Sequence, residues 1–190
     1  MSPKYLLLAL VFSSTAMAKK LPLPKFDRID LNAYLTQVGK DKELKRLNSR
    51  KAGKDDFFVV ADTNKKGKSA LDKHLFDLDR DGNLDIAKHF ENGQVVRSEW
   101  SLDSDDLVDT IKFHNKDTGD VYLKVERIGE MVVWSHFFKS KLRKKEFDRD
   151  ADLKPDMWYF YRNEKLVKAE ARKSPGSKKI VDITSTLKIK

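Results

Sequence analysis

The sequence contains no cysteine, and this absence excludes several kinds of site. A chain without thiols forms no disulfides, no thiolate zinc site, no cysteine nucleophile and no lipid attachment to cysteine. Long hydrophobic runs are also scarce. The longest lies at residues 5–12, whereas a transmembrane helix needs about 20 apolar residues. We therefore expect a protein that does not span a membrane and that is stabilised by packing, a metal ion or a partner.

Residues 1–18 have the pattern of a secretory signal peptide. Lys4 supplies the positive charge, residues 5–12 are apolar, and Ala16, Met17 and Ala18 form an A-x-A cleavage pattern. An N-terminal membrane anchor or a buried helix is the alternative. We expect cleavage near Ala18 and a periplasmic or secreted protein.

The composition is polar and basic. Charged residues make up 36% of the 190 residues, which excludes a polytopic membrane protein, and aromatic residues make up 10%, which excludes a wholly disordered chain. The formal net charge is +9. A basic chain suggests nucleic acid, but export favours an anionic envelope polymer, a glycan or a protein as partner. A solvated basic surface without a partner is the alternative.

The chain divides into three parts. Residues 1–18 are the expected signal peptide, residues 19–56 a basic arm with a helical region, and residues 57–190 a β-repeat domain. Residues 31–48 are predicted to be helical, because apolar side chains recur there at helical spacing, at Leu31, Tyr34, Leu35 and Val38.

From Phe57 onward the hydrophobic pattern has period two, as in Val121, Leu123 and Val125, which share one face of a strand. Gly67, Gly93 and Gly119 supply turns between such segments. We predict a mainly all-β fold of ten or eleven strands after Phe57. They form an antiparallel meander of about 24-residue hairpin repeats, in a sheet that is curled or covered by the N-terminal helical region.

An acidic loop recurs three times, within residues 76–85, 100–109 and 147–156. Its last aspartate is Asp85 in the first copy, Asp109 in the second and Asp156 in the third. The distance in sequence from the first copy to the third is close to three times the distance from the first copy to the second. Residues 125–139 hold a degenerate copy without the acids. Coincidence among Asp-rich turns is the alternative, but three copies in register favour a true repeat.

Oxygen ligands at alternate positions of these loops fit calcium, a hard cation that takes six to eight oxygens. The predicted ligands are Asp77, Asp79, Asp81, Asn83 and Asp85 in the first loop, Asp103, Asp105 and Asp109 in the second, and Asp148, Asp150, Asp152 and Asp156 in the third. The first loop resembles the D-x-D-x-D-G-x-x-D calcium loop of integrin-type FG-GAP repeats. The alternatives are Asx turns that cap strand ends, or pairing of the acids with Arg80 and Arg149.

The strand-turn-strand half of the repeat resembles bacterial MORN-variant repeats, which carry aromatic-x-Asn-Gly hairpins. Residues 89–99 hold the clearest copy, with Phe90, Asn92 and Gly93. The resemblance implies a β-repeat scaffold used for contacts, and it implies no chemistry.

No catalytic motif stands out, so we predict a non-enzymatic binding or structural protein. The alternative is an envelope hydrolase that uses the clustered acids or histidines, of which His89, His114 and His136 would be the candidates. Aromatic residues occur on both faces of the strand after residue 156, more than a half-buried strand needs. The predicted partner-binding residues are Trp134, Trp158, Tyr159 and Tyr161, and a strand buried on both faces is the alternative.

Overall fold

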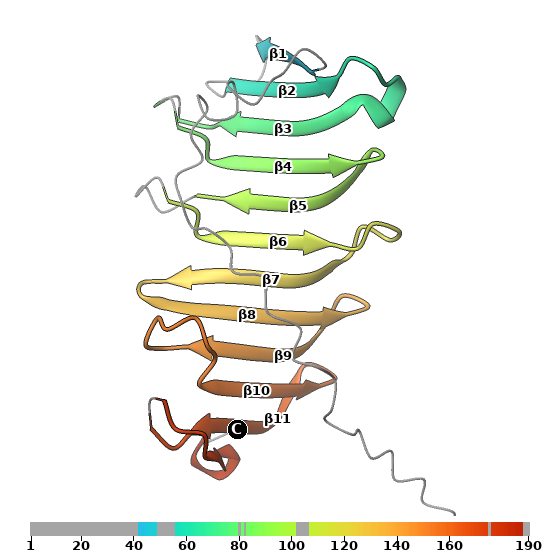
Figure 1. The fold of residues 1–190 in the computed structure, drawn as a ribbon. Helices are drawn as coiled ribbons and strands as arrows, with labels where there is room; N and C mark the ends of the chain where they lie inside the picture. The colour runs from blue at the N-terminus through green and yellow to red at the C-terminus, as the bar shows by residue number, and fades with distance from the viewer. Residues whose placement is uncertain are drawn as a thin grey trace, which may run out of the picture.

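The computed structural model describes residues 42–48, 56–79, 81, 83–101, 107–174 and 176–187, with side chains from Val60 onward. Within these residues the strands form one antiparallel sheet of twelve strands in chain order (Figure 1). The strands are β1 Lys42–Asn48, β2 Asp56–Asp62, β3 Leu71–Asp77, β4 Ile86–Glu91, β5 Gln94–Trp100, β6 Thr110–His114, β7 Val121–Ile128, β8 Met131–Phe138, β9 Lys141–Asp148, β10 Met157–Arg162, β11 Lys165–Arg172 and β12 Ile180–Asp182. Short 3-10 helices lie at Gly67–Ala70 and Thr184–Thr186.

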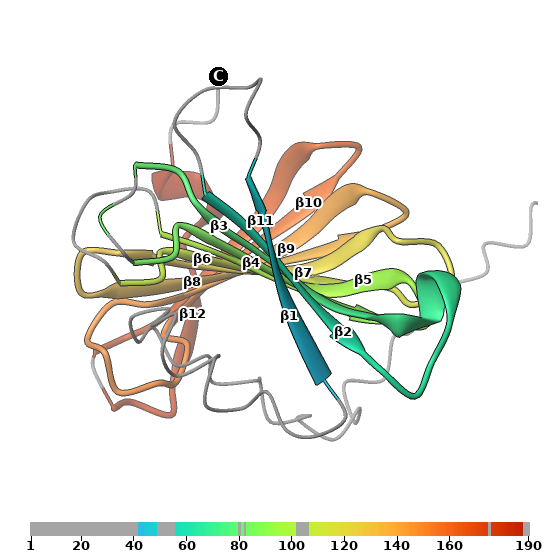
Figure 2. The same cartoon turned by 90° about the horizontal axis from the view of Figure 1, so that it is seen from above.

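The predicted all-β meander is confirmed, and the sheet does not close, since β1 and β12 lie at opposite ends of the strand order. The strands rotate progressively along the stack (Figure 2), as the right-handed twist of each strand requires. The predicted strand number also holds, with eleven strands from β2 onward.

The prediction of a helix through Asn48 is wrong for its last part. Residues 42–48 form β1, which pairs in antiparallel register with β2 from Lys42 opposite Asp62 to Asn48 opposite Asp56. The backbone of β2 would otherwise present an unpaired edge, and its hydrogen bonds outweigh the helical spacing of the apolar residues. The sheet thus begins before residue 57, and residues 31–41 lie outside the described part.

Tight turns join the strands at one end of the sheet. Asn92 and Gly93 have φ angles of 51° and 78°, and Asn163 and Glu164 have 49° and 63°. Two consecutive positive φ angles define the type I′ turn that suits the twist of a hairpin. At the other end, Gly129 and Glu130 alone join β7 to β8, so the degenerate repeat has a tight turn where its neighbours have acidic loops.

Five hairpins, β2–β3, β4–β5, β6–β7, β8–β9 and β10–β11, each have one irregularity in the register near the turn. In β4–β5 the shift lies between His89 and Phe90, and in β8–β9 it lies between His136 and Phe137. The other three hairpins carry the same feature. A bulge of this kind adds one residue to a strand and increases the local twist. The sequence repeat is therefore a structural unit of two strands, one turn and one bulge.

One face of the sheet, here called the core face, carries a continuous row of directly opposite residues. From β3 to β11 the row is Leu75, Ala87, Glu99, Ile111, Val125, Trp134, Glu146, Trp158 and Glu170. Leu75, Ala87, Ile111, Val125 and Trp134 are all completely buried.

The acidic loops help to cover this face. Leu84 from the first loop and Val108 from the second pack with Leu75, Ala87 and Ile111 in one hydrophobic cluster. Phe113 contacts this cluster and also the neighbouring cluster that contains Trp134. Leu84 and Val108 each lie directly before the last aspartate of their loop, so the repeat supplies equivalent apolar side chains that fold over the sheet.

Gly93 tests the turn geometry. The φ of Gly93 is positive, which is unfavourable for a residue with a side chain. A Cβ at this residue would also lie 2.9 Å from the Cβ of Lys68. Gly93→Ala should therefore lower the free energy of unfolding by about 1–3 kcal/mol, measured by urea denaturation. Gly129→Ala is the matched control, since it has φ 61° but no neighbour within 4 Å. An equal or smaller loss at Gly93 than at Gly129 would contradict the close packing of the turn.

Candidate functional site

The three acidic loops share their backbone hydrogen bonds. The N–H groups of Asp85, Asp109 and Asp156 donate to the carbonyls of Phe76, Trp100 and Phe147 at 2.8–2.9 Å. The carbonyls of the same three aspartates accept from Ser101, Arg127 and Arg172 at 2.7–2.8 Å. The recurrence of the loop in the sequence therefore corresponds to real structural equivalence.

The last aspartate of each loop has a structural partner. A carboxylate oxygen of Asp85 accepts the backbone N–H of Leu78. Asp156 accepts the backbone N–H of Arg149 at 3.3 Å and its Nε at 2.6 Å. Asp109 pairs with Arg127 at 3.4 Å. These aspartates close their loops, and the pair of Asp156 with Arg149 is the one that the arginine-pairing alternative predicted.

Asx turns account for other carboxylates in the loops. Asp79 accepts the N–H of Asp81 at 3.1 Å, and Asp81 accepts the N–H and the side-chain amide of Asn83 at 2.7 and 2.8 Å. Asp152 accepts the N–H of Lys154 at 2.8 Å. Carboxylate acceptors two positions before the donor are typical of Asx turns.

Two groups of carboxylates nevertheless come together. Asp77, Asp79 and Asp85 offer oxygens within 4.8 Å of one another, and so do Asp148, Asp150 and Asp152. Of the predicted ligands, Asp81 and Asn83 are outside the first group, and Asp156 is outside the second. Asp103 and Asp105 lie outside the described residues.

Each group contains one buried carboxylate, Asp77 in the first group and Asp148 in the second. Asp148 is completely buried at the end of β9, whereas Asp150 and Asp152 are exposed. Desolvation by burial raises the pKa of Asp148, and the adjacent Asp150 carboxyl raises it further. Burial likewise raises the pKa of Asp85. Carboxylates held close together in this way favour either a proton or a cation.

The histidines do not form a cluster. His89 and His136 lie on the core face, on β4 and β8, four strand spacings or about 19 Å apart, while His114 lies on the opposite face. Among the described residues, the groups able to hold a metal contain only aspartates. His89, His114 and His136, the candidates of the hydrolase alternative, are thus not brought together.

His114 contacts Ser98, but the hydroxyl of this serine is not accessible as a nucleophile. Its ring bridges Ser98 Oγ at 3.2 Å and the carbonyl of Gly119 at 3.0 Å. Ser98 is only 2% exposed and also accepts the indole N–H of Trp100 at 3.3 Å. A substrate has no access to this hydroxyl, so the contact fastens β5 to β6.

Ion pairs recur on the core face, and sequence reasoning missed them. Glu146, 6% exposed, pairs with His136 at 3.0 Å and with Lys144. At the equivalent position two repeats earlier, Glu99 pairs with His89 at 3.6 Å and with Arg97. Lys168 pairs with Glu170 at 2.6 Å in the last hairpin. The signal was present in the repeat, where each glutamate lies two positions after a basic residue.

The opposite face, here called the lysine face, has a different charge pattern. Its central row from β3 to β11 is His74, Lys88, Ser98, Lys112, Lys124, Ser135, Lys145, Tyr159 and Ala169. The parallel row towards the acidic loops is Phe76, Ile86, Trp100, Thr110, Glu126, Val133, Phe147, Met157 and Ala171. Within these two rows, four lysines stand against one glutamate, Glu126, which pairs with Lys124 at 2.5 Å.

The predicted partner-binding aromatics separate into three environments. Trp134 is completely buried in the core, so its interpretation as a partner-binding residue is replaced by a core role. Trp158 is half-buried on the core face and stacks under Arg172 at 5.6 Å. Tyr159 and Tyr161 are half-buried on the lysine face, and Tyr159 packs on Phe147 with ring centres 4.8 Å apart.

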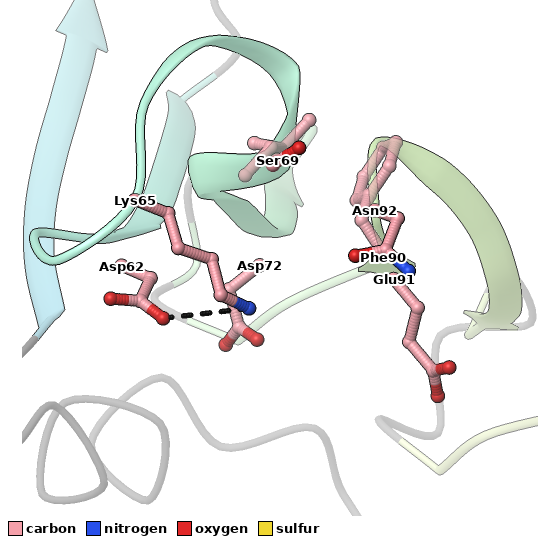
Figure 3. A pocket seen from close by; sticks show the side chains of 8 residues that line it. Asp62, Lys65, Ser69, Asp72, Phe90, Glu91 and Asn92 are labelled. Atoms are coloured by element: carbon pink, nitrogen blue, oxygen red, sulfur yellow. Dashed lines mark ion pairs between the residues drawn. The ribbon is translucent and has the colours of Figure 1, made fainter.

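A pocket of about 340 Å³ lies between the β2–β3 connection and the β4–β5 turn (Figure 3). Asp62, Asp72 and Glu91 line it with Lys65, whose Nζ lies 3.7 Å from Asp62. Glu91 also pairs with Lys116. The lining is polar and its charged groups are paired, so it offers neither an apolar site nor a catalytic set.

Comparison with known proteins found no match, either to a protein-family model or to a curated protein. The likeness to FG-GAP loops and MORN-variant hairpins therefore remains a likeness of motifs. Within the described part of the chain, no helix is long and apolar enough to cross a membrane.

The ion pairs of Glu146 predict a pH dependence. Burial would raise the pKa of Glu146, but hydrogen bonds from His136 and Lys144 outweigh it and lower the pKa below its ordinary value of 4.5. A lowered pKa in the folded protein stabilises the fold above about pH 4.5, and this stabilisation is lost as the pH falls through the folded value.

Glu146→Gln should therefore lower the free energy of unfolding by about 1–3 kcal/mol at pH 7, and the difference from wild type should shrink below pH 4.5. Urea unfolding at pH 7, 5 and 3.5 measures it, with the exposed Glu130→Gln as control. A difference that stays constant over this range would contradict the account.

Proposed function

We propose that this protein is an exported, non-enzymatic binding scaffold that holds an anionic glycan polymer on its lysine face. The observation that carries the proposal is the unequal distribution of charge between the two faces. On the core face, Glu99, Glu146 and Glu170 each pair with a neighbouring base. The lysine face concentrates positive charge along one row that runs across the strands.

The row has an arrangement that an extended anion would stabilise. Lys112 and Lys124 are directly opposite each other on β6 and β7, and Glu126 compensates only Lys124. Uncompensated like charges at such positions destabilise a sheet by tenths of a kcal/mol to about 1 kcal/mol. Lys88 and Lys145 continue the row over five strand spacings, or about 24 Å. A linear polymer with regularly spaced negative groups matches this geometry, and a small anion does not.

Aromatic rings next to the lysines favour a sugar polymer. The ammonium of Lys112 lies 4.7 Å from the ring centre of Trp100, and that of Lys88 lies 5.4 Å from the ring centre of Phe76. Each pair presents a charge beside a flat apolar ring. Such a surface suits a polymer that combines carboxylate, sulfate or phosphate groups with the apolar faces of sugar rings.

Export supports a glycan rather than nucleic acid as the occupant. The expected signal peptide would place the chain outside the cytoplasm, where anionic envelope polymers are the abundant polyanions. The resemblance to MORN-variant hairpins is in line with a scaffold used for contacts. No observation on the described residues favours the hydrolase alternative.

Binding should depend on the lysine face and on salt. Lys112→Gln combined with Lys145→Gln should weaken binding to a heparin-type sulfated polysaccharide by at least about tenfold, taking about 1 kcal/mol for each lysine. Affinity should also fall as salt rises, because charge neutralisation releases counterions. Calorimetric titration of the protein purified from expression of the full chain measures both effects.

The matched control is Lys141→Gln combined with Lys165→Gln, which removes two exposed lysines at the hairpin turns and gives the same net charge. It should bind nearly as well as wild type. Equal losses in the two double variants would show attraction to net charge alone and would overturn the proposal. Tighter binding to single-stranded DNA than to the polysaccharide would overturn the choice of a glycan.

A further inference from the structure

We propose that Asp148, Asp150 and Asp152 in the third acidic loop bind a calcium ion, and that the first loop, which matches the calcium pattern better in sequence, does not. The inference is independent of the glycan proposal, because it concerns the loop end of the sheet and not the lysine face.

Asp148 carries the argument. It is 0% exposed, and its Oδ1 atom has no hydrogen-bond partner among the described residues. Its other oxygen accepts the backbone N–H of Leu153 at 2.8 Å. A buried carboxylate oxygen without a partner is costly, and the oxygens of Asp150 and Asp152 lie within 4.8 Å of the Asp148 ligand atom. A divalent cation within this group would compensate the buried Asp148 carboxylate and offset two of the three negative charges.

The loop is tightly folded around the three aspartates. Ala151 and Leu153 have positive φ angles of 57° and 63°, which are uncommon for residues with a side chain. A pocket of about 110 Å³ adjoins the cluster, lined by Asp150, Asp152 and Lys154 among others. It has room for a few waters that would complete the coordination of calcium.

The first loop lacks the decisive feature. Asp79 accepts one Asx-turn N–H, as Asp152 does in the third loop, so the Asx turns do not separate the two loops. Asp85 accepts the N–H of Leu78. Asp77, the residue equivalent to Asp148, has an interaction partner. The environment of the first carboxylate therefore favours the third loop, although the first loop is the one that resembles the D-x-D-x-D-G-x-x-D calcium pattern.

Thermal unfolding in EDTA and in millimolar calcium tests the site, with sodium chloride of equal ionic strength as the salt control. Calcium should raise the midpoint of the wild type, because it binds the native state alone, and Asp150→Asn should abolish the rise. The equivalent residue in the first loop is Asp79, and Asp79→Asn should keep it. Loss of the rise in Asp79→Asn but not in Asp150→Asn would overturn the assignment, as would an equal rise in sodium chloride.

Two further variants distinguish binding from a folding defect. Asp148→Asn should raise the midpoint in EDTA, because it removes a buried charge, and it should remove the response to calcium. Lys154 Nζ lies 3.1 Å from Asp152 Oδ2 and competes with the cation, so Lys154→Gln should tighten calcium binding about two- to fivefold in calorimetric titration. A wild-type protein that releases no heat on calcium addition and shows no midpoint change would refute the site.

Discussion

The antiparallel register between neighbouring strands is the constraint on which the rest of this structure depends. Directly opposite residues in an antiparallel pair point to the same face. The register continues in step through every strand from β3 to β11, so each position of the repeat forms a row across the sheet. A shift of one residue in the register of any hairpin would move its side chains to the opposite face. The bulges lie near the tight turns, so the register is regular in the part of each strand that leads to the acidic loops.

The described residues form a single sheet, and its two faces carry different side chains. The core face buries Leu75, Ile111 and Trp134, adds apolar side chains from the loops, and pairs each of its glutamates with a base. The lysine face instead sets lysines beside half-buried aromatic neighbours. Most of the completely buried apolar residues described therefore lie on the core face, whereas the lysine face also buries Ser98, Ser135 and Ala169.

Much of this arrangement follows from the sequence. Period-two alternation and the Asn92–Gly93 turn predict the meander, and the repeat of Asp85 at Asp109 and Asp156 predicts the equivalence of the loops. Strand β1 was not predicted because it depends on pairing with β2, and the local spacing of apolar residues does not indicate that pairing. The two faces depend on the register across strands, and the burial of Asp148 depends on how its loop folds against β9. The composition predicts a basic protein, but it does not predict that four lysines lie in one row on one face of the sheet.

The most direct test of this account is the reactivity of individual lysines towards acetylation, measured by mass spectrometry with and without a sulfated polysaccharide. Lys144 and Lys145 are adjacent in sequence but lie on opposite faces. The account predicts that the polysaccharide protects Lys145 together with Lys88 and Lys112, while Lys144 and Lys168 keep their reactivity. Equal protection of Lys144 and Lys145, or protection confined to the turn residues Lys139 and Lys141, would contradict it.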